Sequence, residues 1–152
     1  MSSAICSALQ LPTTNAGQFD LSQLATPYAV IYFYPKDNTP GCTTETADFR
    51  DHYTQFIAAG ATVYGVSRDS IKSHENFKAK LGLDFELISD PEEVACEAFG
   101  VMKLKNMYGK QVRGIERSTF VISASGEILK EWRGVKVPNH VAEVLNFVVS
   151  LK

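Results

Sequence analysis

A short segment with one cysteine constrains this chain most: Pro35-Lys-Asp-Asn-Thr-Pro-Gly-Cys42, a loop by composition, lies between an apolar run and a helical pattern. The run before it, Ala29–Tyr34, is continuously apolar, β-branched and aromatic, which predicts a strand buried on both faces. After it, from about Thr43 to Ala59, apolar residues recur at helical spacing, and Gly60 follows. The residues of that apolar face are Phe49, Tyr53, Phe56 and Ile57. This strand–loop–helix unit predicts an α/β sheet, with the cysteine at a junction where such sheets place chemistry.

The rest of the chain continues the alternation of strand and helix patterns. The segments Leu9–Pro12 and Gln18–Leu21 predict an opening hairpin. Further strands are expected at Ala61–Ser67, Phe85–Ile88, Ser118–Ser123 and Glu127–Trp132. Helices are expected at Ile71–Leu81, at Glu92–Phe99 after Pro91, and around Val141, Val144, Leu145 and Val148. Lys103–Gly114 is polar and is expected to be an extended loop, and residues 1–152, without repeats or linkers, are expected to form one domain.

Composition excludes several classes of function. The net charge is -2 and no Lys/Arg-rich run occurs, so nucleic acid is not an expected partner. The longest apolar stretches, such as Tyr28–Tyr34, are too short to span a bilayer. Met1–Gln10 lacks a basic region followed by a long apolar region, so we expect no secretory signal, no membrane partner and a cytoplasmic location.

Three cysteines, Cys6, Cys42 and Cys96, form no CxxC pair. This number and spacing argue against a disulfide framework and against a zinc site, so no metal is expected. The three histidines share no metal-binding spacing and are expected on the surface or on helix faces. They are His52, His74 and His140.

The local pattern favours a reactive Cys42. Thr39 is suited to cap a helix and Pro40 to occupy its first position, which places Cys42 in the first turn. Unpaired N–H groups and the positive end of the helix dipole favour a thiolate there. Arg117 is the leading candidate for a guanidinium that adds to this effect. On residues alone two alternatives stay open, a Cys42 that merely packs in the core and an Arg117 that is an ordinary solvated strand residue.

A family resemblance bears on these alternatives. The segment from Tyr32 to Glu45, Tyr-Phe-Tyr-Pro-Lys-Asp-Asn-Thr-Pro-Gly-Cys-Thr-Thr-Glu, resembles the active-site segment of peroxiredoxins, most narrowly the bacterioferritin-comigratory protein (peroxiredoxin Q) subfamily. Pro35, Thr39 and Cys42 meet the family pattern Pro-x-x-x-Thr-x-x-Cys. Other segments agree in order, and the resemblance runs from about Leu9 to the C-terminus. They are Gly65–Asp69, Leu87–Asp90, Cys96–Val101, Glu116–Ile122 and Ala124–Ile128.

The resemblance implies a thioredoxin-like fold, with a central mixed β-sheet flanked by helices. It implies a thiol-dependent peroxidase that reduces hydrogen peroxide and organic hydroperoxides through a sulfenic acid on Cys42. Sulfur then carries the electrons, and no cofactor is needed. By resemblance Thr39, Pro35 and Arg117 surround Cys42, with Glu45 and Gly41 as supporting residues.

These residue types suit that chemistry. Arg117 offers permanently charged donors to the negative charge that moves along S–O–O, and the Thr39 hydroxyl can orient the peroxide. Pro35 stiffens the loop and keeps water from the sulfur. Glu45 has a simpler alternative role, to complement the helix dipole.

The chain departs from the subfamily where a second cysteine is common. Five residues after Cys42 stands Ala47, and the segment 74–80 holds no cysteine. We therefore expect a one-Cys mechanism with thioredoxin, glutaredoxin or a small thiol as the external reductant. A disulfide with Cys96 or with Cys6 remains as the alternative. By resemblance a monomer is expected, with a weak dimer as the alternative.

Two other functions remain open from sequence. A thiol–disulfide oxidoreductase on the same fold would require a CxxC pair, whereas Cys42 is followed by Thr-Thr-Glu. A binding or chaperone module without catalysis would keep the fold and lose the peroxide reaction.

Overall fold

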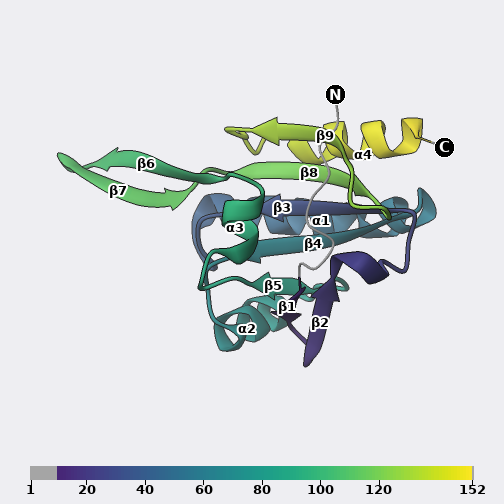
Figure 1. Ribbon diagram of the computed structural model, residues 1–152, viewed down its shortest axis with the longest axis horizontal. Helices are drawn as coiled ribbons and strands as arrows, with labels where there is room; N and C mark the ends of the chain where they lie inside the picture. Colours follow the sequence, from purple (N-terminus) through teal and green to yellow (C-terminus); the bar gives the residue numbers. More distant parts are fainter. Residues whose placement is uncertain (1–9, 152) are drawn as a thin grey trace.

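The computed structural model describes residues 10–151, and these form a mixed seven-stranded sheet in the order β2-β1-β5-β4-β3-β8-β9 (Figure 1). Three central strands run parallel, and the outer ones join antiparallel. The strands are β1 Gln10–Thr13, β2 Gly17–Asp20, β3 Tyr28–Phe33, β4 Ala61–Ser67, β5 Leu87–Ser89, β8 Ser118–Ser123 and β9 Ile128–Arg133. The predicted central mixed sheet and the predicted opening hairpin are confirmed.

Helices cover both faces of this sheet. They are α1 Pro40–Ala58, α2 Ile71–Leu81, α3 Val94–Ala98 and α4 His140–Ser150, with a 3₁₀ turn, η1, at Leu21–Gln23. Buried side chains of α1, α2 and α4 form one core cluster, and those of α3 and the β1–β2 hairpin form a second. Figure 1 accordingly shows α3 on the near side of the sheet and α1 behind it. No helix within residues 10–151 is long and apolar enough to cross a bilayer.

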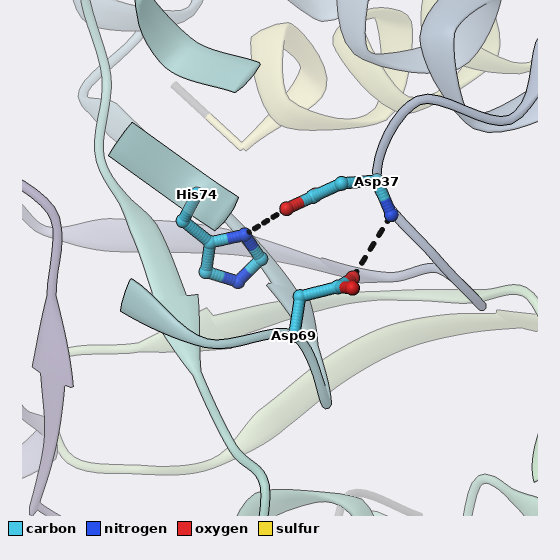
Figure 2. A group of neighbouring side chains, drawn as sticks. All are labelled: Asp37, Asp69 and His74. Atoms are coloured by element: carbon cyan, nitrogen blue, oxygen red, sulfur yellow. Dashed lines mark hydrogen bonds and ion pairs between the residues drawn. The ribbon is translucent and has the colours of Figure 1, made fainter. Parts of the chain in front are cut away.

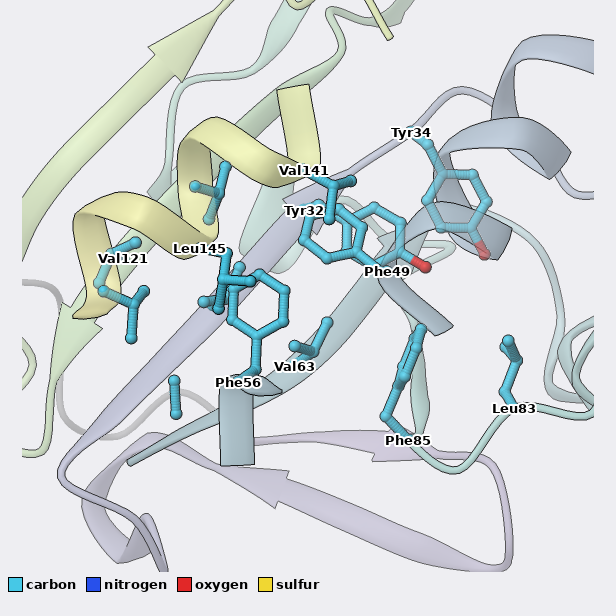
Figure 3. Close-up of a cluster of buried hydrophobic side chains, with 14 of the residues drawn as sticks. Tyr32, Tyr34, Phe49, Phe56, Val63, Leu83, Phe85, Val121, Val141 and Leu145 are labelled. Carbon is cyan, nitrogen blue, oxygen red and sulfur yellow. The ribbon is translucent and has the colours of Figure 1, made fainter. Parts of the chain in front are cut away.

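The first core cluster explains why α1 lies where it does (Figure 3). Phe49 and Phe56 are fully buried, and the Phe49 ring stacks on Tyr32 of β3 with ring centroids 4.4 Å apart. Valines and a leucine of α4 close the same cluster, which confirms the predicted final helix. Ile57, predicted on the buried face of α1, is instead 45% exposed, because it lies at the edge of the face that Phe49 and Phe56 define.

The expectation of a loop at Lys103–Gly114 was wrong. The segment is a two-stranded hairpin of β6 Met102–Met107 and β7 Lys110–Ile115, which projects from the body of the molecule (Figure 1). Its turn residues Tyr108 and Gly109 both have positive φ, 55° and 79°, as hairpin turns that match strand twist require. Most of the described side chains of this hairpin are exposed, so the alternation of apolar and polar residues that marks a half-buried strand is missing.

The helix expected at Glu92–Phe99 is shorter, and Pro91 precedes it instead of opening it. Asp90 directly follows β5, and its two carboxylate oxygens accept from the N–H groups of Val94 and Cys96. This side chain satisfies the free donors of the first turn and so sets the start of α3.

The histidines were expected on the surface or on helix faces, and all three do lie on helices, but two of them are buried. His74 is fully buried and His140 is 7% exposed, whereas His52 is half-buried on α1. Each buried ring has a polar partner in the interior, Asp37 for His74 and Thr119 for His140. Buried partners of this kind are distant in sequence, so spacing could not reveal them.

Candidate functional site

The candidate site lies where the loop after β3 meets the start of β8. Cys42 falls in the first turn of α1, which begins at Pro40 as predicted. Phe33, the last residue of β3, pairs with Ser118, the first residue of β8. Arg117 directly precedes Ser118, so sheet pairing places it beside the loop that follows β3.

The guanidinium of Arg117 joins two side chains of α1. Its Nη2 donates to Cys42 Sγ at 3.4 Å, and its Nη1 donates to Glu45 Oε1 at 2.7 Å. Cys42 is 1% exposed and Glu45 is fully buried, while 17% of the Arg117 side chain reaches solvent. The sulfur is therefore buried, but it faces a fixed cation instead of a purely apolar interior.

Thr39 occupies the N-cap position of α1, with extended φ and ψ of -91° and 151°. Within the described part of the chain its side chain makes no capping bond, and its Oγ1 donates instead to the Lys36 carbonyl at 2.8 Å. The expected side-chain cap is therefore wrong, although the expected position is right. Because Thr39 does not cap the helix, the N–H groups of the first turn have no acceptor from that side chain.

Gly41 makes room for the cation. A β-carbon added at this position would lie 3.2 Å from Nη2 of Arg117, closer than side-chain contacts usually come. Pro35, at the other end of the loop, is half-buried. The structure therefore brings Arg117 to both Cys42 and Glu45, with Gly41 beside the guanidinium, whereas Thr39 and Pro35 lie in the loop that leads to Cys42.

Burial governs the ionisation of Glu45. It raises the pKa of this carboxyl to about 7, and the adjacent Arg117 acts in the opposite direction without offsetting it. The second oxygen, Oε2, finds no partner among residues 10–151, which explains why the charge is costly there. Burial also acts to lower the pKa of Arg117, but the Glu45 carboxylate and the Cys42 sulfur outweigh it and raise that pKa.

Replacing Glu45 by glutamine is expected to change how stability depends on pH. The pKa of Glu45 is raised from 4.5 to about 7 on folding. Between these values the unfolded chain loses the proton and the folded chain keeps it, so stability falls as pH rises. The free energy of unfolding of the wild type should drop by about 3 kcal/mol relative to Glu45→Gln across this window. Urea unfolding at pH 4.5 and pH 7.5 measures the difference.

A matched control for this experiment is Glu92→Gln, which changes an exposed glutamate before α3. This variant should follow the wild type at both pH values. Parallel pH curves for the wild type and Glu45→Gln would contradict the assignment of a raised pKa to Glu45.

The other described cysteine, Cys96, is not part of this cluster. Cys96 is fully buried in α3, within the core cluster on the opposite face of the sheet from Cys42. Burial and the neighbouring Asp90 raise the pKa of the Cys96 thiol well above its ordinary value, so it stays protonated. Cys6 lies outside the described residues.

A second polar cluster, not predicted from the sequence, lies against the loop that carries Asp37. It consists of Asp37, Asp69 and His74, drawn in Figure 2. The one available signal was the position of His74, three residues from both Ile71 and Phe77 on the apolar edge of α2. A histidine at such a position faces the interior and needs a buried partner.

The chain is similar to known proteins over most of its length. The family model of the AhpC/TSA family matches residues 4–131. Peroxiredoxin Bcp of Xanthomonas campestris is 55% identical over 137 residues, which cover 90% of this chain and 86% of that protein. Peroxiredoxin Bcp of Bacillus subtilis is 50% identical over 137 residues, with coverages of 90% and 87%.

The solved structures that resemble this chain include peroxiredoxins of the same group. The bacterioferritin comigratory protein of X. campestris, studied for its alkyl peroxide reduction activity, superimposes with a TM-score of 0.92 at 49% identity. The match covers 98% of this chain and 96% of that one. A cysteine-to-serine mutant of PrxQ from Xylella fastidiosa superimposes with a TM-score of 0.93 at 45% identity, covering 99% and 96%.

Proposed function

Because this chain belongs to the AhpC/TSA family, as a peroxiredoxin of the Bcp and peroxiredoxin Q group, we propose that Cys42 is the sulfur with which it reduces hydroperoxides. The chain is a thiol peroxidase with the thioredoxin-like fold of these relatives. One observation supports the assignment of Cys42 above all: its Sγ lies in the first turn of α1, 3.4 Å from Nη2 of Arg117. The helix terminus and the guanidinium both favour a thiolate at that position.

The proposed reaction uses the groups around the sulfur in distinct roles. The Cys42 thiolate attacks one peroxide oxygen, and the S–O bond forms as the O–O bond breaks. The second oxygen leaves as hydroxide or alkoxide and takes a proton to become water or alcohol. Sulfur loses two electrons and becomes a sulfenic acid, while the peroxide gains them. Arg117 and the first-turn N–H groups stabilise the moving negative charge, the Thr39 hydroxyl orients the peroxide, and Pro35 excludes water.

A one-Cys mechanism fits the positions of the described cysteines. A disulfide requires Cα atoms within about 7 Å, and Cys42 and Cys96 belong to core clusters on opposite faces of the sheet. An external thiol would then form a mixed disulfide with Cys42 and release water, and a second thiol would restore the cysteine. The thiol would come from thioredoxin, glutaredoxin or a small molecule, and we expect the enzyme to act as a monomer.

The experiment that tests this function follows the oxygen atom. One equivalent of hydrogen peroxide should raise the intact mass of the protein by one oxygen, and peptide mapping with a sulfenic acid trap should place that oxygen on Cys42. Cys96→Ala should give the same product, because Cys96 plays no part in the step. Loss of two hydrogens would instead show an internal disulfide, and an unchanged mass would contradict the proposed role of Cys42.

A further inference from the structure

We propose that the buried ion pair between Asp37 and His74 positions the loop that carries Pro35 and Thr39, and thereby determines how a peroxide meets Cys42. The pair lies between this loop and the first turn of α2 (Figure 2). The inference rests on the proposed role of Cys42 and adds two positioning residues to that site.

The hydrogen-bond partners of His74 call for a donor at both ring nitrogens. Its Nδ1 lies 2.7 Å from Oδ2 of Asp37, and its Nε2 lies 2.9 Å from the backbone oxygen of Ile88. A carboxylate and a carbonyl only accept hydrogen bonds, so both ring nitrogens must donate. An imidazole with two N–H groups is positively charged, and this one is fully buried. It therefore depends on the carboxylate of Asp37 as its counter-ion.

Three side chains form hydrogen bonds with the carboxylate of Asp37. Oδ1 accepts from the Tyr34 hydroxyl at 2.6 Å, and Oδ2 accepts from the Ser73 hydroxyl at 2.8 Å and from His74. Burial acts to raise the pKa of Asp37, but these donors, and His74 above all, lower it below its ordinary value. A buried carboxylate with several donors is held in one orientation, because any displacement breaks more than one bond.

The backbone of the loop is held as well. The Asp37 N–H donates to Oδ2 of Asp69 at 2.9 Å, and the Ser67 hydroxyl donates to the same oxygen. The side chain of Asp37 is thus hydrogen-bonded to α2. Its main chain is hydrogen-bonded to Asp69, which follows β4. Two residues separate Asp37 from the first residue of α1, and one of them, Asn38, has a left-handed φ of 64°. Little freedom remains between this anchor and the helix start.

A metal site is the alternative interpretation of the same cluster. One ligand atom each from Asp37, Asp69 and His74 lies within 4.8 Å of the others. A ring that donates through both nitrogens offers no lone pair to a metal, however, and the carboxylate oxygens facing it already accept hydrogen bonds. The bonding pattern therefore favours an ion pair that holds the loop.

The test separates positioning from the reactivity of the sulfur. His74→Gln, Asp37→Asn and the double variant are compared with the wild type in two reactions of Cys42, with hydrogen peroxide and with iodoacetamide. Displacing a reacting group by about 1 Å can cost about 100-fold, so we expect the peroxide rate constant to fall about 30-fold in His74→Gln. Alkylation needs a reactive sulfur but no aligned O–O bond, and should change less than about 3-fold.

The double variant tests whether the pair acts as a unit. If it does, the double variant should be no slower than the slower single variant, because the second change removes nothing further. The matched control is His52→Gln, which changes a half-buried histidine of α1 whose Nδ1 faces the backbone oxygen of Asp48. It should leave both rates unchanged.

Ser73→Ala serves as a milder variant, since it removes one donor to Asp37 and leaves the ion pair in place. A peroxide rate about 3-fold lower is expected, with folding confirmed by urea titration.

Peroxide rates equal to the wild type in both His74→Gln and Ser73→Ala would overturn the positioning role, as would an equal fall of the peroxide and alkylation rates. A wild type inert towards peroxide would instead overturn the proposed role of Cys42, so the two failures are distinguishable.

Discussion

Replacing Cys42 by serine is expected to lower the rate of peroxide consumption at least about 10⁴-fold, to the uncatalysed background. A serine hydroxyl fits the same space, but it stays neutral at physiological pH and cannot be oxidised as sulfur can. The other thiol within residues 10–151 cannot substitute, because Cys96 is fully buried and its pKa is raised. Peroxide consumption with dithiothreitol as reductant measures the loss.

The matched control for this prediction is Cys96→Ala. This change empties a buried position of α3 and is expected to lower stability by about 1–3 kcal/mol without slowing peroxide consumption. Two results would contradict the assignment: a Cys42→Ser protein that still consumes peroxide rapidly, or a folded Cys96→Ala protein that does not. Urea unfolding of both variants separates a lost nucleophile from a lost fold.

Local sequence signals were sufficient to predict the start of α1 and the buried strands. Pro40 marks the first helical residue, Phe49 and Phe56 define the buried face, and the apolar run before Pro35 became β3. The β6–β7 hairpin was missed because its exposed side chains give no alternation of apolar and polar residues. The alternation of apolar and polar residues reflects burial of one face of a strand, so it cannot predict a strand that is solvated on both faces.

The site was predictable to a similar degree. A motif of eight residues placed Cys42 and Thr39 at a helix start, because their positions depend on short-range order. Arg117 lies 75 positions from Cys42, and the family resemblance, not local order, predicted that the two meet. The Asp37–His74 pair joins residues 37 positions apart, and no local pattern in the sequence links the two. Contacts of this kind are set by how α2 packs against the loop, which is a tertiary property.

Replacing Arg117 by lysine is expected to lower the peroxide rate constant about 100-fold, and replacing it by methionine about 1,000-fold. The arginine holds Cys42 Sγ and Glu45 Oε1 through two different nitrogens, at 3.4 Å and 2.7 Å. Lysine keeps the charge but has one nitrogen, so it cannot keep both contacts in this geometry. Methionine keeps the length and removes the charge, which leaves the buried Glu45 without its partner.

The two variants divide the contribution of Arg117 into charge and geometry. The ratio of the rate constants of Arg117→Lys and Arg117→Met measures the contribution of the charge. The ratio of the wild type to Arg117→Lys measures the contribution of the two simultaneous contacts with Cys42 and Glu45. Both are read from stopped-flow reaction with hydrogen peroxide, after urea unfolding shows that each variant folds. Glu45→Gln combined with Arg117→Met should recover stability but not rate, because it removes a buried carboxyl that has lost its cation. A lysine variant as fast as the wild type would show that a positive charge alone is sufficient for the wild-type rate. The contacts through two nitrogens would then contribute nothing to catalysis.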